Sequence, residues 1–131
     1  MEHLDAVAQA RLAWVKSLSD DERALLYGEK AAWANEETKG ERIAEMLATF
    51  QANDTNADGL LNRAEFDNFV KAMGQNAAAR GLPVEDYDSL SEELKEKWYA
   101  VFAAYNTEAN GVSMTSFDAA FKAISEKMAT M

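Results

Sequence analysis

Apolar residues recur at intervals of three and four along most of the chain, which is the spacing that places side chains on one face of an α-helix. The first such run predicts an amphipathic helix over about residues 2–18. Its apolar positions are Leu4, Val7, Ala8, Leu12, Val15 and Leu18. The pattern continues to the end of the chain, and Gly28 interrupts the second predicted helix. The sequence therefore predicts an all-α fold.

Two capping boxes predict where helices begin. In a capping box, a serine or threonine and a glutamate three residues later bond each other's backbone N–H groups. Ser19 with Glu22 predicts the start of a second helix, and Thr38 with Glu41 predicts the start of a third. The apolar positions of the second helix are Leu25, Leu26 and Trp33.

The third to sixth predicted helices form two pairs. Their apolar positions are Ile43, Met46, Leu47 and Phe50; Phe66, Phe69, Val70 and Met73; Leu94, Trp98, Val101, Phe102 and Tyr105; and Met114, Phe117, Phe121, Ile124 and Met128. A polar segment at 54–65 separates the helices of the first pair, and the fourth helix is expected to end before residues 81–83. An acidic linker at 84–88 then leads to the second pair, for which Ser89 or Ser91 is the expected N-cap.

The polar segment 54–65 has the sequence DTNADGLLNRAE, in which oxygen-bearing side chains alternate, a glycine follows, and a glutamate closes the segment. These residues are Asp54, Asn56, Asp58, Gly59 and Glu65, with the apolar Leu61 at position 8. The dodecapeptide resembles the calcium loop of the EF-hand family at every diagnostic position. Glycine is expected at position 6 because the chain must turn there in a backbone region that other residues avoid.

This resemblance implies one Ca²⁺ site, because Ca²⁺ takes six to eight oxygen ligands that a tightly folded loop can supply. The implied ligands are the side chains of Asp54, Asn56 and Asp58, the backbone carbonyl of Leu60, Asn62 directly or through a water, and both carboxylate oxygens of Glu65. The bidentate glutamate favours Ca²⁺ over the smaller, octahedral Mg²⁺.

A second segment, residues 106–117, resembles the first loop less closely. Its counterparts of positions 1, 3, 5 and 6 are Asn106, Glu108, Asn110 and Gly111. Beyond the glycine two alignments are open: Val112 at position 7 with Phe117 at position 12, or one residue deleted, with Val112 at position 8 and Ser116 at position 12. Neither supplies the closing glutamate, so we expect a degenerate hand. The alternative is weak calcium binding with Asp118 as a substitute ligand.

The resemblance also implies an organisation: two EF-hands paired as in one calmodulin-type lobe and preceded by an N-terminal helical pair. The predicted units are residues 1–37, which pack on the lobe, and the lobe 38–131, made of a calcium-binding hand at 38–80 and a degenerate hand at 89–131. In this family the loops pair through a short two-stranded contact. Leu60, Leu61 and Asn62 are therefore expected beside Val112.

Composition narrows the possible functions. A net charge of −10 and a pI near 4.5 disfavour nucleic acid or an anionic membrane as a partner. The absence of cysteine excludes disulfides and thiolate sites, and the only histidine is His3, so most nucleophilic and acid–base schemes lack parts. No membrane span, secretory signal or myristoylation site is visible. We expect a cytoplasmic protein that is not an enzyme.

Three functions are compatible with these features. The first is a calcium sensor that, when loaded, binds the amphipathic helix of a target protein through an apolar groove. Methionines suit such a groove, although a methionine at helical spacing more often belongs to an ordinary core; those of the lobe helices are Met46, Met73, Met114 and Met128. The second is a calcium buffer, and the third is a light-chain-like structural subunit for which calcium is secondary. Residues 1–37 are a further candidate occupant of the groove.

Overall fold

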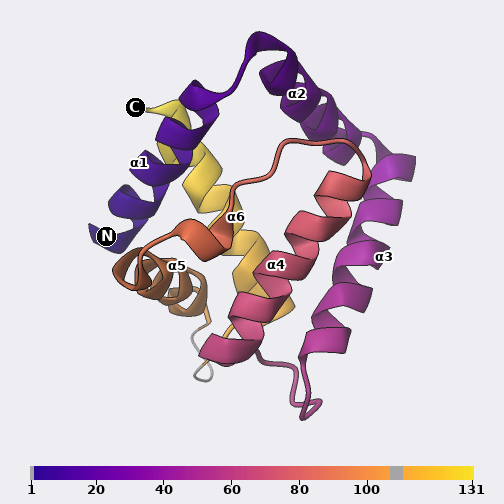
Figure 1. Cartoon of the computed structure of the whole chain (residues 1–131). Coiled ribbons are helices and arrows are strands. Elements are labelled where there is room, and N and C mark those ends of the chain that lie inside the picture. Colours follow the sequence, from indigo (N-terminus) through magenta and orange to yellow (C-terminus); the bar gives the residue numbers. More distant parts are fainter. Residues whose placement is uncertain (1, 107–110) are drawn as a thin grey trace.

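The protein is described by a computed structural model, which covers residues 2–106 and 111–131 (Figure 1). The elements in these ranges are α1 (Glu2–Ser17), α2 (Asp20–Ala34), α3 (Glu36–Asn53), α4 (Arg63–Ala79), the 3₁₀ helix η1 (Tyr87–Ser89), α5 (Glu92–Ala104) and α6 (Met114–Ala129). The described part of the chain has no β-strand, and the predicted all-α class is confirmed. None of its helices is both long enough and apolar enough to cross a membrane.

Side-chain caps fix most of the helix starts. The capping box predicted at the start of α2 is present: the Glu22 N–H donates to Ser19 Oγ at 3.2 Å, and the Ser19 N–H donates to Glu22 Oε1 at 2.9 Å. For α5, Ser91 rather than Ser89 is the N-cap, and its hydroxyl accepts the Leu94 N–H at 3.1 Å.

The capping box predicted for Thr38 and Glu41 is wrong. Helix α3 begins at Glu36, because the side chain of Asn35 caps it by accepting the N–H groups of residues 37 and 38 at 3.1 and 3.3 Å. Asparagine is at least as strong an N-cap as threonine, and it occurs three residues earlier. The helix therefore starts before the predicted domain boundary at residue 38.

One hydrophobic core joins α3, α4, α5 and α6. Aromatic rings run through it: Phe50 meets Phe69 at 5.7 Å between centroids, Phe69 meets Phe117 at 5.0 Å, and Phe117 stacks on Phe102, also at 5.0 Å. Because these rings come from all four helices, both helix pairs share this core. The C-terminal end of α3 and the N-terminal ends of α4 and α6 lie at the same end of the molecule (Figure 1).

Helix α1 is attached to the second helix pair by apolar burial. It packs against α5 and α6, and its Val7 and Ala8 are completely buried. Asp5 forms an ion pair with Lys127 of α6 at 2.9 Å, and Arg11 pairs with Glu85 at 3.3 Å. Helix α1 thus covers part of the face that α5 and α6 present.

Helix α2 is attached by ion pairs and by one partly buried aromatic side chain. It contacts α3, none of its residues is fully buried, and its Trp33 packs against the core. Its Glu29 accepts from Arg42 of α3 at 2.6 Å and from Arg80, at the end of α4, at 3.3 Å. Bonding to Arg42 lowers the pKa of the Glu29 carboxyl. The two N-terminal helices therefore contact different parts of the molecule.

Candidate metal centre

The loop at 54–65 connects α3 to α4 through two residues in the left-handed region of the backbone. Gly59 has φ 78° and Ala57 has φ 55°. Helix α3 ends with the Asp54 N–H donating to the Phe50 carbonyl at 3.0 Å. Glycine at position 59 fits its predicted role, because a side chain in that conformation is strained.

Asp54 organises the first half of the loop. Its Oδ2 accepts the Gly59 N–H at 2.8 Å, and its Oδ1 accepts the Asp58 N–H at 3.3 Å. Asp58 in turn accepts the Leu60 N–H on Oδ1 at 2.9 Å. The chain therefore curls around the carboxylate at position 1, with backbone amides directed at the two aspartates.

Glu65 lies in the first turn of α4 and is 7% exposed. Its Oε1 accepts the Asn62 N–H at 3.0 Å, while Oε2 accepts both the backbone N–H of Thr55 at 2.8 Å and the Thr55 hydroxyl at 2.9 Å. The bond from the Asn62 backbone is the main reason that the Glu65 pKa is lowered, against an opposing effect of burial. Glu65 is therefore a buried, charged carboxylate with hydrogen bonds to both oxygens.

Asn62 is the N-cap of α4. Its side-chain oxygen accepts the Glu65 N–H at 2.9 Å, which completes a capping box with the carboxylate of Glu65. Because that oxygen already serves the helix, direct contact with an ion would compete with the cap. Of the two routes predicted for Asn62, this geometry favours the one through a water.

The donor types of the loop suit a hard cation, but the structure does not gather them around one point. Among residues 2–106 and 111–131, no three carboxylate or imidazole side chains are grouped so that they could hold a metal ion. Asp54, Asp58 and Glu65 each bond backbone N–H groups instead. Asn56 is exposed, and Leu60 is half-buried. Coordination by the predicted set therefore requires side chains of the loop to move from their present positions.

The second segment meets the first loop through an isolated antiparallel bridge. The Leu61 N–H donates to the Val112 carbonyl at 2.8 Å, and the Val112 N–H donates to the Leu61 carbonyl at 3.0 Å. Gly111 has φ 127°, and a Cβ there would lie 3.1 Å from the Leu61 carbonyl oxygen. Glycine is therefore required by the close approach of the two backbones. Two of the predicted counterparts, Glu108 and Asn110, lie outside the described residues.

The bridge fixes how the two segments correspond. Leu61 is followed by the capping box of Asn62 and Glu65, and Val112 is followed by a capping box of Ser113 and Ser116. In the second box the Ser116 N–H donates to Ser113 Oγ at 3.0 Å, and the Ser113 N–H donates to Ser116 Oγ at 2.8 Å. Ser116 thus occupies the place of Glu65, as in the alignment with one residue deleted. Counted in the sequence, 106–116 has eleven residues and 54–65 has twelve.

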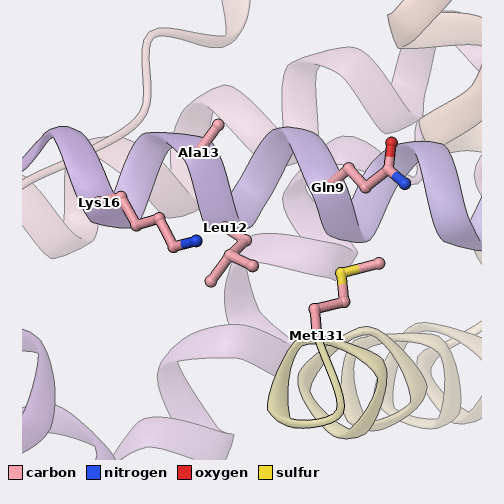
Figure 2. A pocket seen from close by; sticks show the side chains of 5 residues that line it. All are labelled: Gln9, Leu12, Ala13, Lys16 and Met131. Carbon is pink, nitrogen blue, oxygen red and sulfur yellow. The ribbon is translucent and has the colours of Figure 1, made fainter.

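A surface hollow of about 310 Å³ lies elsewhere, between α1 and the end of the chain. Its lining residues are Gln9, Leu12, Ala13, Lys16 and Met131. Figure 2 shows Leu12 and Met131 directed into the same space from the two sides. It contains no carboxylate and none of the predicted calcium ligands, so it offers no metal chemistry.

No protein-family model matches this chain, and no curated protein or solved structure is significantly similar to it. The residues of the two loops are therefore the basis for assigning a function. Thr55 is the residue of this site that the motif did not indicate. It occupies position 2, which the pattern leaves open, and its bond to Glu65 spans ten residues of sequence.

Proposed function

We propose that this protein binds one Ca²⁺ per chain in the loop 54–65 and belongs to the EF-hand type of calcium-binding protein. The observation that carries the proposal is the loop itself. Its oxygen-bearing residues occur at the positions that Ca²⁺ coordination requires, with Gly59 in a left-handed turn and Glu65 in the first turn of the exit helix.

The proposed ligands are Asp54, Asn56, Asp58, the Leu60 carbonyl, Asn62 through a water, and Glu65 with both oxygens. A bound Ca²⁺ would supply the positive charge that offsets three carboxylates held within one short loop. Three carboxylates in such a loop correspond to a dissociation constant on the order of 10⁻⁷–10⁻⁵ M.

The second segment supports a single site. A serine hydroxyl in the place of Glu65 offers one neutral oxygen where bidentate coordination needs two charged ones. Ser116 is also 1% exposed and bonded on both sides to Ser113, with 2.8 Å to its N–H and 3.1 Å to its carbonyl. We assign this hand a structural role: it pairs with the first loop through Leu61 and Val112 and contributes Phe102 and Phe117 to the common core.

The proposed role for the loaded protein is that of a sensor which binds an amphipathic target helix. The link is the position of Glu65, one residue before the buried Phe66 and four before the buried Phe69 of α4. If an ion draws Glu65 away from Thr55, α4 must shift relative to α3, and apolar surface becomes accessible. The exposed Ile43 and Leu47 of α3 would border that surface.

Two alternatives lead to different measurements. A buffer binds calcium without exposing apolar surface, and a light-chain-like subunit binds its partner whether or not calcium is present. Calorimetric titration of the chelator-treated full chain with CaCl₂ tests the common proposal, and one site per chain is the expected result. Two comparable sites would contradict the assigned structural role of the second hand, and no binding would contradict the proposed function.

Fluorescence of a hydrophobic dye, with calcium and with chelator, then separates sensor from buffer. A calcium-dependent rise in dye binding is expected for the sensor. Because α1 already covers part of α5 and α6 through Val7 and Ala8, the expected rise comes from α3 and α4. An unchanged signal would contradict the sensor role, and the buffer and the light-chain-like subunit would remain as alternatives.

A further inference from the structure

We propose that Thr55 sets the calcium affinity of the loop, because its hydroxyl holds the Glu65 carboxylate in the calcium-free state. This inference rests on the proposed function of the loop and adds to it a residue that is not itself a ligand. Thr55 would act through Glu65, as a positioning residue.

The two oxygens of Glu65 are held from opposite ends of the loop. Oε1 is bonded by the Asn62 N–H at 3.0 Å within the first turn of α4. Among the described residues, Oε2 is bonded only by Thr55, through its N–H at 2.8 Å and its hydroxyl at 2.9 Å. The Thr55 hydroxyl is the one side-chain donor to Glu65 among the described residues. It therefore joins the beginning of the loop directly to the carboxylate that closes it.

These bonds oppose metal binding for a geometric reason. An ion coordinated by both oxygens of Glu65 must lie among the side chains of positions 1, 3 and 5, and the described structure gathers no such group. In the proposed calcium-bound state, Glu65 turns toward Asp54 and Asp58, and its Oε2 leaves Thr55. The free energy of the lost bonds is subtracted from the free energy of calcium binding.

Of the two bonds from Thr55 to Glu65 Oε2, only the one from the hydroxyl can be removed by a side-chain substitution. Thr55→Val keeps the branched shape and the backbone N–H and deletes only the hydroxyl. A hydrogen bond to a charged group corresponds to roughly tenfold in an equilibrium constant, and the exposure of Thr55 reduces that value. We expect Thr55→Val to bind calcium about three- to tenfold more tightly than the unsubstituted chain. Thr55→Ser retains the hydroxyl and should bind like the unsubstituted chain.

The experiment is calorimetry with CaCl₂ on the full chain and on its Thr55→Val and Thr55→Ser variants. Tighter binding by Thr55→Val, with binding by Thr55→Ser equal to that of the unsubstituted chain, supports the inference, because a general structural role of position 55 would alter binding in both variants.

Two results would overturn it. Equal or weaker binding by Thr55→Val, with normal binding by the unsubstituted chain, refutes the role of Thr55 and leaves the proposed function intact. Absence of calcium binding by the unsubstituted chain refutes the proposed function and the inference together. Circular dichroism of each calcium-free variant confirms that its helices are formed before the titrations are compared.

Discussion

The loop at 54–65 and the segment that ends at Ser116 begin their exit helices in the same way and differ in the chemistry of one position. Each has an apolar residue in the shared bridge, Leu61 or Val112, and then a capping box. In the third position of that helix, the first has a buried carboxylate and the second a buried hydroxyl.

The difference separates what the fold requires from what a metal requires. The bridge, the caps and the buried rings Phe66 and Phe117 occur in both segments, so the folding requirements are met twice. A carboxylate at the third helix position, which could serve as the proposed bidentate ligand, occurs once. Burial of a charge is costly unless donors surround it, and the three donors to Glu65 meet that condition in the described structure. Ser116 carries no charge, so its burial does not require three hydrogen-bond donors of this kind.

The largest expected effect comes from removing the charge that distinguishes the two positions. Glu65→Gln keeps the size of the side chain and should weaken calcium binding at least about 100-fold. Loss of a residue that only orients a metal ligand typically weakens binding about 10- to 100-fold, and loss of a direct ligand should cost more. Calorimetry with CaCl₂ measures this. The matched variant Ser116→Ala should bind calcium normally, and Asn62→Ala should lose far less than Glu65→Gln. Normal binding by Glu65→Gln would refute the proposed coordination.

The next effect is the stabilisation of the native state by the ion. A ligand that binds only the folded chain stabilises it by about 2.7 kcal/mol at a hundredfold excess over its dissociation constant. The thermal unfolding midpoint should therefore rise with calcium and return with chelator. At the same calcium concentration, Glu65→Gln should be stabilised by only about 0.4 kcal/mol or less, because binding weakened 100-fold brings the ion to its dissociation constant. A midpoint that calcium leaves unchanged in the unsubstituted chain would contradict metal binding by the folded loop.

A smaller effect tests what the two segments share. Asn62 and Ser113 cap α4 and α6 with bonds of 2.9 and 3.0 Å, and replacing either by alanine should cost about 1 kcal/mol. Urea unfolding in chelator should give similar losses for Asn62→Ala and Ser113→Ala. A much larger loss for one of them would show that the two capping boxes are not equivalent in the calcium-free protein.

The sequence predicted those features that depend on residues close together in the chain. The capping box of Ser19 and Glu22 was confirmed at the expected residues, as was the all-α class. The failure at Thr38 is also local: two caps compete within four residues, and motif matching favoured the one with a glutamate, whereas the chain uses Asn35. A single-residue cap is a weaker sequence signal than a reciprocal pair.

Features that depend on contacts between residues far apart in the chain could not be predicted from the sequence. Spacing left two alignments of the second segment open, and only the backbone bonds between Leu61 and Val112 distinguish them. The role inferred for Thr55 depends on a residue ten positions away. The separate attachment of α1 and α2 depends on which residues meet in space, such as Glu29 with Arg80. Periodicity shows that a helix has an apolar face but does not show what covers it.

The smallest expected effect concerns Asp118, the only substitute ligand that the sequence suggested for the second segment. Asp118 is exposed on α6, two residues beyond Ser116, which already occupies the place of the closing ligand. A residue one or two positions further along a helix points to a different side, so its carboxylate cannot replace one at position 116 without unwinding the first turn. Asp118→Asn should therefore leave both the calcium stoichiometry and the dissociation constant unchanged in calorimetry. A loss of binding sites in Asp118→Asn would show that the second segment binds calcium, and the distinction between the two loops would then be one of affinity rather than of kind.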